Sequence, residues 1–112
     1  MKSFLLSFLV IAAFSLPNQR PIIGIYTQVN EDDPPRANSE EIFQTFISAS
    51  YIKFVEMSAA QVVPIFSYSN QSDIAALLPK LNGVLFPGGD LDFDLKNRWT
   101  SNANFIFKYA IQ

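Results

Sequence analysis

Three short apolar runs in the middle of the chain predict β-strands. The runs cover Ile22–Tyr26, residues 62–66 and residues 83–86. Consecutive apolar residues, many of them β-branched or aromatic, are typical of strands that are covered on both faces. Pro64 lies inside the second run and cannot donate a hydrogen bond to a neighbouring strand. We therefore expect Pro64 near the end of its strand or at an irregularity.

Helical periodicity precedes the second run. Asn38 followed by Glu41 indicates a helix start, because Asn can cap a helix and acidic residues suit the positive end of the helix dipole. The pattern predicts a long amphipathic helix from there to about Ala59 and Ala60, with its aromatic face in the core. The residues on this face are Phe43, Ile47, Ser50, Tyr51, Phe54, Val55 and Ser58.

Two further helices complete the expected fold. The first covers residues 73–78, with Ser72 as its cap and Pro79 at its end. The second has a single apolar face, made of Trp99, Ala103, Ile106, Phe107 and Ala110. Strands that alternate with helices predict a parallel sheet with right-handed crossovers, and so an α/β fold.

Residues 1–15 have the pattern of a secretory signal peptide. Lys2 gives a positively charged start, residues 4–14 are apolar except for Ser7, and small residues near Ser15 suit cleavage. The apolar stretch is short for a membrane span, and a buried core helix is the alternative interpretation. We expect cleavage near Ser15, which leaves residues 16–112 as one α/β domain in the secretory pathway.

Composition excludes several kinds of chemistry. The chain has no Cys and no His, and its formal net charge is −2. Without Cys there is neither a disulfide framework nor thiol chemistry, and carboxylates alone are an improbable zinc site. The absence of a basic patch argues against a nucleic-acid partner. Asp90, Asp92 and Asp94 alternate like the start of a calcium loop, but Leu95 and Ser101 occupy the positions that require Gly and Glu. We expect no metal and no cofactor.

The third apolar run ends in Pro87, Gly88 and Gly89, here called the Pro-Gly-Gly loop. Parallel sheets bind ligands at the carboxyl ends of their strands, and backbone amides held there can stabilise the oxyanion of acyl transfer. The alternative is a plain tight turn, which the spacing alone favours. Phosphate binding would need Lys and Ser or Thr after the glycines, whereas Asp90 follows here. No nucleophile and base accompany the loop, so the residues themselves form no complete catalytic site.

One glycosylation signal supports the secretory interpretation. Asn70 begins an Asn-Gln-Ser sequon in a polar stretch between apolar runs. Such triplets are common by chance, but behind a signal peptide Asn70 becomes a candidate for glycosylation.

Three segments together carry a family resemblance. They are residues 21–25 (PIIGI), residues 48–56 with 62–65 (SASYIKFVE and VVPI), and residues 82–89 (NGVLFPGG). Their order and spacing resemble the N-terminal part of the γ-glutamyl hydrolase family, peptidase family C26 of the class I glutamine amidotransferase-like superfamily. The departures lie at the end of the first helix, where Ala59 stands in place of a frequent Gly and Met57 replaces a small residue.

The resemblance implies a fold and an activity. The fold is the parallel three-layer sandwich of the flavodoxin-like type, of which only the first βαβαβ part is present. The activity is hydrolysis of γ-glutamyl bonds in folyl poly-γ-glutamates, without cofactor, by a Cys nucleophile whose His base is oriented by a Glu. These three residues are expected beyond Gln112, so this chain alone is expected to be inactive. Gly88 and Gly89 are implied as the backbone side of the oxyanion site.

The resemblance also implies a setting for the protein. The family is secreted or lysosomal (vacuolar in plants), acts on a small-molecule substrate, has no membrane anchor after signal cleavage and admits a homodimer. Two alternatives stay open. In the first, the chain is a catalytically dead secreted binding domain. In the second, it is part of another glutamine amidotransferase-like hydrolase.

Overall fold

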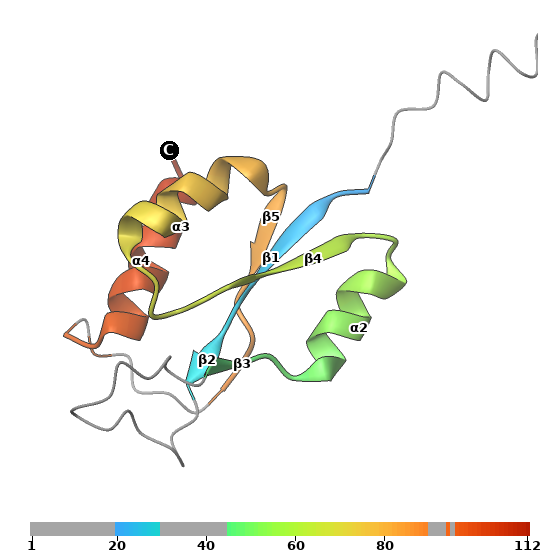
Figure 1. The fold of residues 1–112 in the computed structure, drawn as a ribbon, viewed down its shortest axis with the longest axis horizontal. Coiled ribbons are helices and arrows are strands. Elements are labelled where there is room, and N and C mark those ends of the chain that lie inside the picture. Colours follow the sequence, from blue (N-terminus) through green and yellow to red (C-terminus); the bar gives the residue numbers. More distant parts are fainter. Residues whose placement is uncertain (1–19, 30–44, 90–93, 95) are drawn as a thin grey trace, which may run out of the picture.

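A three-stranded parallel sheet forms the centre of the molecule (Figure 1). The computed structural model describes residues 20–29, 45–89, 94 and 96–112. Within them, the sheet has the order β4-β1-β5, with β1 at Ile22–Tyr26, β4 at Gln61–Ile65 and β5 at Gly83–Leu85. The prediction of three parallel strands is confirmed. The second strand begins and ends one residue earlier than predicted, and the third ends one residue earlier.

Pro64 lies in β4 on the outer side of its strand. It is paired with Ile25 in the parallel register. Gln61 donates its N–H to Pro21, and Ile65 accepts from Thr27, so the odd-numbered residues of β4 face β1. The nitrogen of Pro64 therefore faces away from β1, where a missing donor costs no hydrogen bond within the described sheet.

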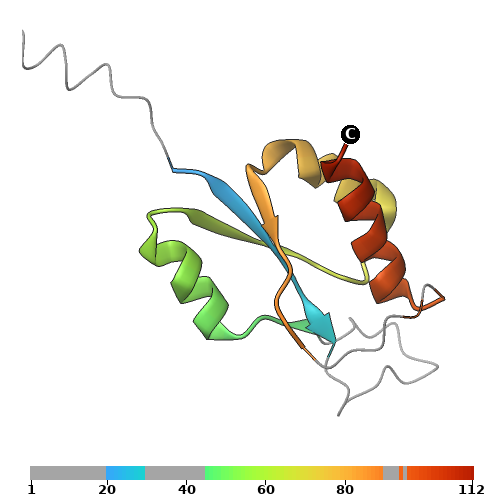
Figure 2. The ribbon, with the colours of Figure 1, turned by 180° about the vertical axis from the view of Figure 1, so that it is seen from behind.

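Helices cover both faces of the sheet, as Figures 1 and 2 show. The helix α2 (Ala49–Met57) packs on one face, where Val55 and Ala60 surround Ile25. The other face carries α3 (Gln71–Leu77), the 3₁₀ turn η1 (Leu78–Lys80) and α4 (Arg98–Ala110). The core on that side consists of Tyr26, Ile65, Ile74, Leu78, Trp99 and Ile106. The neighbouring β1 residues Ile25 and Tyr26 thus point to opposite faces of the sheet, as successive side chains of a strand do.

The prediction of a helix from Asn38 to about Ala59 and Ala60 is wrong at its start. Thr45–Phe46 forms the strand β3, which pairs antiparallel with β2 (Gln28–Val29). The helix begins only at Ala49, after Ser48 in an extended conformation. β-Branched and aromatic residues favour strand pairing over helix where a partner strand is available. Asn38, Glu41 and Phe43 lie outside the described residues.

Two predicted aromatic core positions are also wrong. Phe54 is 72% exposed, because the inner face of α2 is formed by Tyr51, Ile52 and Val55 instead. Phe107 of α4 is 60% exposed, while Asn102 of the same helix is buried. The sequence predicted that α2 and α4 each have an apolar face. It did not predict which residues at the edge of that face are buried against the sheet, because this depends on packing that the helical period does not specify.

The short helix α3 starts earlier than the prediction for residues 73–78. Asn70 takes the N-cap position in place of Ser72, which lies inside the first turn. Pro79 does not end the structure abruptly, since it sits in the first turn of η1, where no N–H is needed. For α4, Asn97 caps the helix by accepting from Trp99 N–H at 2.9 Å.

The expected signal peptide and its cleavage site fall within residues 1–19, which lie outside the described residues. Among the helices that the structure does describe, none combines the length and apolar character needed to cross a bilayer.

A left-handed residue follows helix α2 and its C-cap Ser58. Ala59 has φ 64°, whereas the described glycines all have φ outside the left-handed region. The N–H groups of Ser58 and Ala59 bond to Val55 and Glu56 at 3.1 and 3.0 Å, closing the last turn. A left-handed residue directly after a helix is usually Gly, since a Cβ is strained there.

Replacing Ala59→Gly should stabilise the fold. Removing the Cβ relieves the left-handed strain, and we expect the free energy of unfolding to rise by about 0.5–1 kcal/mol after the added flexibility of the unfolded chain is counted. Urea unfolding followed by circular dichroism measures the change.

A matched control is Ala76→Gly, on the exposed side of α3. In a helix interior the same substitution should lower the free energy of unfolding by about 0.5–1 kcal/mol. Equal losses at both positions would contradict the proposed strain at Ala59.

Candidate functional site

The carboxyl ends of the three parallel strands meet at one edge of the sheet. There, β1 continues into Thr27 and Gln28, β4 continues into Phe66 and Ser67, and β5 leads into the Pro-Gly-Gly loop. Figure 1 shows β2 and β3 at this end of the sheet. This edge is where open α/β sheets bind ligands, so it is the candidate site.

A pair of reciprocal hydrogen bonds joins β1 to the first turn of α4. The Tyr26 hydroxyl donates to the carbonyl oxygen of Trp99 at 2.7 Å, and the Trp99 indole N–H donates to the carbonyl oxygen of Thr27 at 2.9 Å. Both side chains are buried, and their rings lie 5.1 Å apart between centroids. Hydrogen bonds in such dry surroundings allow α4 few alternative positions.

Burial raises the pKa of the Tyr26 hydroxyl well above the usual value for tyrosine, and the nearby Tyr68 adds to the rise. Tyr26 therefore remains a neutral donor throughout the physiological range. Its ring also contacts Phe86, with centroids 5.3 Å apart. Tyr26 is thus in contact with both α4 and the exit of β5.

A second set of bonds fixes the end of β4. Thr27 and Ser67 bond through their hydroxyls at 3.1 Å, and the Ser67 N–H donates to the Thr27 Oγ1 at 2.9 Å. The Asn102 amide of α4 donates to the carbonyls of Ser67 and Ser69 at 2.8 and 2.9 Å. Every buried side-chain nitrogen and oxygen of the described residues has a partner. These bonds are structural, because each group is already occupied.

The Pro-Gly-Gly loop lies beside β2. Gly88 and Gly89 are exposed and Pro87 is buried. The Gln28 amide nitrogen donates to the carbonyl oxygens of Gly88 and Pro87, the latter at 3.5 Å. A Cβ added to Gly89 would collide with the Gln28 amide, whereas one added to Gly88 would lie 3.7 Å from the Tyr51 hydroxyl. The loop is therefore held from its β2 side.

The other predicted site residues lie apart from this edge or outside the described residues. Asn70 is exposed at the start of α3, and its Oδ1 accepts from the Arg98 guanidinium at 2.8 Å. The calcium-like alternation rejected above includes Asp90 and Asp92, which are outside the described residues. Asp94 accepts the backbone N–H of Lys96 at 3.0 Å. Over the described ranges, acidic, Cys and His side chains form no metal-binding group.

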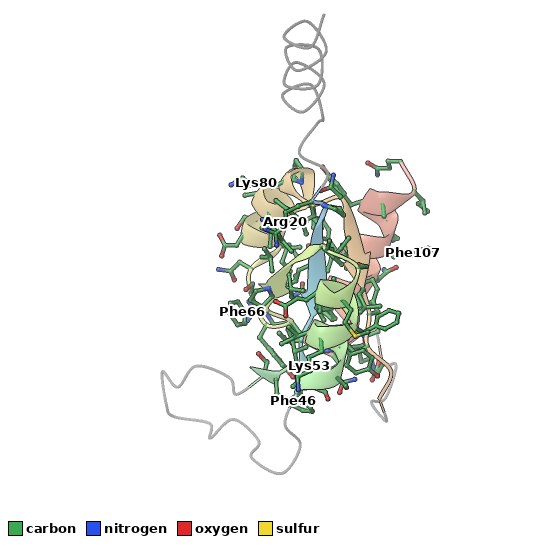
Figure 3. All side chains as sticks on the ribbon, turned by 90° about the vertical axis from the view of Figure 1, so that its right-hand side faces the viewer. Arg20, Phe46, Lys53, Phe66, Lys80 and Phe107 are labelled. Carbon is green, nitrogen blue, oxygen red and sulfur yellow. The ribbon has the colours of Figure 1, made fainter. Side chains whose placement is uncertain are left out.

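Two large aromatic side chains are exposed on the outer surfaces of the molecule. Figure 3 shows Phe66 and Phe107 on opposite outer surfaces, and they are 57% and 60% exposed. An apolar pocket of about 420 Å³ lies between β5, η1 and α4, and Phe107 is part of its wall. It carries no cluster of titratable groups, so it offers no chemistry of its own.

The sequence indicated the loop but not Gln28, which bonds to it. It also did not indicate the polar contacts of Thr27, Ser67 and Asn102 at the end of β4, because these residues follow no periodic pattern. The one available signal was position, since Thr27 with Gln28 and Ser67 directly follow predicted strands, where functional side chains gather in α/β sheets.

The fold and the loop together define a class of protein. A parallel sheet covered by helices on both faces, with a glycine loop at the carboxyl end of β5, is part of the flavodoxin-like, class I glutamine amidotransferase-like type of α/β domain. The Peptidase C26 family model matches residues 21–104. The chain belongs to this family.

Curated relatives agree with the family. Gamma-glutamyl hydrolase B of Dictyostelium discoideum is 33% identical over 94 residues, which are 84% of this chain and 26% of the relative. Gamma-glutamyl hydrolase of Rattus norvegicus is 40% identical over 95 residues, or 85% of this chain and 28% of the relative. The Homo sapiens enzyme is 31% identical over 94 residues, or 84% and 28%. The chain thus spans about a quarter of the length of these relatives.

Removing the Tyr26 hydroxyl should destabilise the junction of β1 and α4. We expect Tyr26→Phe to lower the free energy of unfolding by about 0.5–1.5 kcal/mol, because the buried hydrogen bond from the Tyr26 hydroxyl to the Trp99 carbonyl is lost. Tyr109→Phe, at an exposed position of the same helix, is the matched control and should change little. Denaturant unfolding of the three proteins measures the difference.

The Tyr26→Phe variant also tests the raised pKa of Tyr26. The unfolded tyrosine loses its proton near pH 10, while the native one retains it at higher pH, so the native state binds more protons there. The free energy of unfolding should therefore fall as the pH rises above about 10. The fall should be shallower in Tyr26→Phe than in the parent. Identical slopes would contradict the assignment.

Proposed function

We propose that this chain is the N-terminal part of a γ-glutamyl hydrolase that cleaves γ-glutamyl bonds of folate poly-γ-glutamates. The observation that carries the proposal is the Pro-Gly-Gly loop, exposed at the carboxyl end of β5 within a segment that matches the Peptidase C26 family. The names of the curated relatives support the γ-glutamyl bond as the reacting group.

The loop's role in the reaction is oxyanion stabilisation. A Cys thiolate attacks the γ-glutamyl carbonyl carbon, and the electron pair of the C=O moves to its oxygen. The N–H groups of Gly88 and Gly89 then donate to that oxygen. When the tetrahedral intermediate collapses, the C–N bond breaks and the His gives a proton to the leaving amine; water then hydrolyses the thioester. The Cys, the His and its orienting Glu belong to chain beyond Gln112, and no metal or cofactor takes part.

A second candidate is a secreted binding domain without catalysis. The absence of Cys and His from all 112 residues favours it. Another glutamine amidotransferase-like hydrolase is the third candidate, since the glycine loop would serve any such amide. Both candidates predict that γ-glutamyl folates are not the substrate of a longer product.

Extending the reading frame tests the proposal. The purified chain should show no hydrolysis of folyl poly-γ-glutamate, whereas a product that continues past Gln112 into a Gly-x-Cys-x-Gly elbow should hydrolyse it. In that product Gly89→Pro, which removes one N–H donor, should lower kcat by about 100-fold or more. Chromatographic detection of released glutamate measures turnover.

Two outcomes would contradict this function. Turnover by the pure 112-residue chain would mean that the chemistry does not need the Cys and His. A genomic sequence without such an elbow in any downstream frame would favour the binding domain.

We also place the protein in the secretory pathway, with residues 1–15 as a cleaved signal and the mature product extracellular or lysosomal. The proposed substrate is a small molecule, and the formal net charge of −2 argues against a nucleic-acid partner. A homodimer stays a prediction from the family resemblance.

Asn70 should be glycosylated when the chain is expressed in a secreting eukaryotic cell. Its side chain is exposed and uses only Oδ1 to accept from Arg98, which leaves the amide nitrogen available for the sugar. Ser72→Ala removes the sequon without touching that contact. Loss of a deglycosidase-sensitive mass in this variant is expected; an unmodified secreted parent would contradict the prediction.

A further inference from the structure

We propose that Gln28 is a positioning residue that orients the peptide groups of the Pro-Gly-Gly loop so that the N–H groups of Gly88 and Gly89 face away from β2, toward an incoming oxyanion. The inference rests on the proposed function, because it explains how that loop obtains its orientation. Gln28 was not among the residues identified from sequence.

The hydrogen-bonding capacity of Gln28 matches the loop. A side-chain amide nitrogen carries two donors, and Gln28 directs them to two successive carbonyl oxygens, those of Pro87 and Gly88. The opposite orientation of the amide would bring its Oε1 against two acceptors and be repulsive. The side chain therefore acts as a two-point clamp on the carbonyl side of the loop.

Clamping the carbonyls also fixes the amides. The described peptide bonds are all trans, and in a trans peptide the C=O and N–H point in opposite directions. The Pro87 carbonyl shares a peptide plane with Gly88 N–H, and the Gly88 carbonyl shares one with Gly89 N–H. Both N–H groups therefore point away from Gln28. Donors held in advance toward developing charge are what oxyanion stabilisation requires.

The same contact explains the residue type at position 89. A Cβ on Gly89 would occupy the space of the Gln28 amide, whereas a Cβ on Gly88 would meet only the Tyr51 hydroxyl at an ordinary 3.7 Å. Since neither glycine has a left-handed φ, space rather than backbone conformation is what Gly89 provides. Gln28 and Gly89 thus form a complementary pair.

The backbone that carries Gln28 is itself anchored. Thr27 N–H donates to the Ile65 carbonyl at 3.0 Å, which ties the chain to β4 immediately before Gln28. Gln28 then pairs with Phe46 in the β2–β3 ribbon. The clamp therefore connects an exposed loop to two fixed strands.

Glycine-selective isotope labelling gives a direct test on the complete chain. The sequence has four glycines, of which Gly89 alone follows a glycine and Gly88 alone follows a proline. Labelling glycine nitrogen together with glycine or proline carbonyl carbon therefore assigns both loop amides and both clamped carbonyls by NMR. Gly24 and Gly83, within the sheet, serve as internal references.

Gln28→Met removes both donors at similar side-chain length, and Gln61→Met makes the same change at an exposed position of β4. In Gln28→Met we expect the carbonyl resonances of Pro87 and Gly88 to shift upfield, as they do when a hydrogen bond is lost, and the amides of Gly88 and Gly89 to lose order. Gly24 and Gly83 should stay unchanged, as should all four glycines in Gln61→Met.

Gln28→Glu adds a readout that a merely structural role would not move. Near pH 7 its carboxylate has no donor and repels both carbonyls, so the carbonyl shifts should resemble those of Gln28→Met. Below its pKa, about 4.3 in an unperturbed side chain, the protonated group can donate one bond and partly restore the parent spectrum. Gln61→Glu controls for the charge.

Titration with methylphosphonate, a small tetrahedral oxyanion, separates the clamp from the function. In the parent we expect saturable shifts of the Gly88 and Gly89 amides, weakened by about tenfold in Gln28→Met. Unchanged carbonyl shifts in Gln28→Met would overturn the clamp, even if the anion binds. Shifted carbonyls without anion binding would support the clamp and count against the oxyanion function. Random-coil positions for all four parent glycines, or equal movement of all four in Gln28→Met, would overturn the clamp.

Discussion

The bond between the Tyr26 hydroxyl and the Trp99 carbonyl is the contact on which the site edge depends. Together with the Trp99 indole bond to Thr27, it fixes the first turn of α4 against the last residues of β1. Both side chains are buried, so a displaced helix would lose these two bonds in surroundings where water does not readily replace them. A polar junction thereby selects one docking position that apolar packing alone would leave less defined.

The consequences of that junction extend to both sides of the sheet edge. Asn102, about one turn along α4 from Trp99, donates to the carbonyls of Ser67 and Ser69, so the same part of α4 also holds the end of β4. The Tyr26 ring packs against Phe86 at the exit of β5. Two residues later in the chain, Gln28 contacts the Pro-Gly-Gly loop. The end of β1 therefore organises a helix, a neighbouring strand end and a loop within three residues of sequence.

The sequence allowed the sheet to be predicted, because runs such as Ile22–Tyr26 are apolar at successive positions and can be satisfied only by a strand covered on both faces. The prediction of one long helix failed at Thr45–Phe46, where strand pairing with Gln28–Val29 outweighs the helical period of the flanking residues. The loop could be located from its glycines and its place after a strand. Its contact with Gln28 could not be predicted. Gln28 and Gly88 are 60 residues apart in the sequence, and a single polar residue after a strand belongs to no periodic pattern.

Gly88 and Gly89 show that the same sequence motif can occur for different physical reasons. Read alone, two glycines after a strand favour a tight turn, because glycine is the residue that tolerates unusual backbone angles. The observed angles need no such tolerance. Gly89 leaves room for the Gln28 amide. That amide in turn fixes the direction of two peptide dipoles in the loop. A side chain at position 89 would displace the clamp without changing the turn, so the loop would keep its shape while its N–H groups lost their common direction.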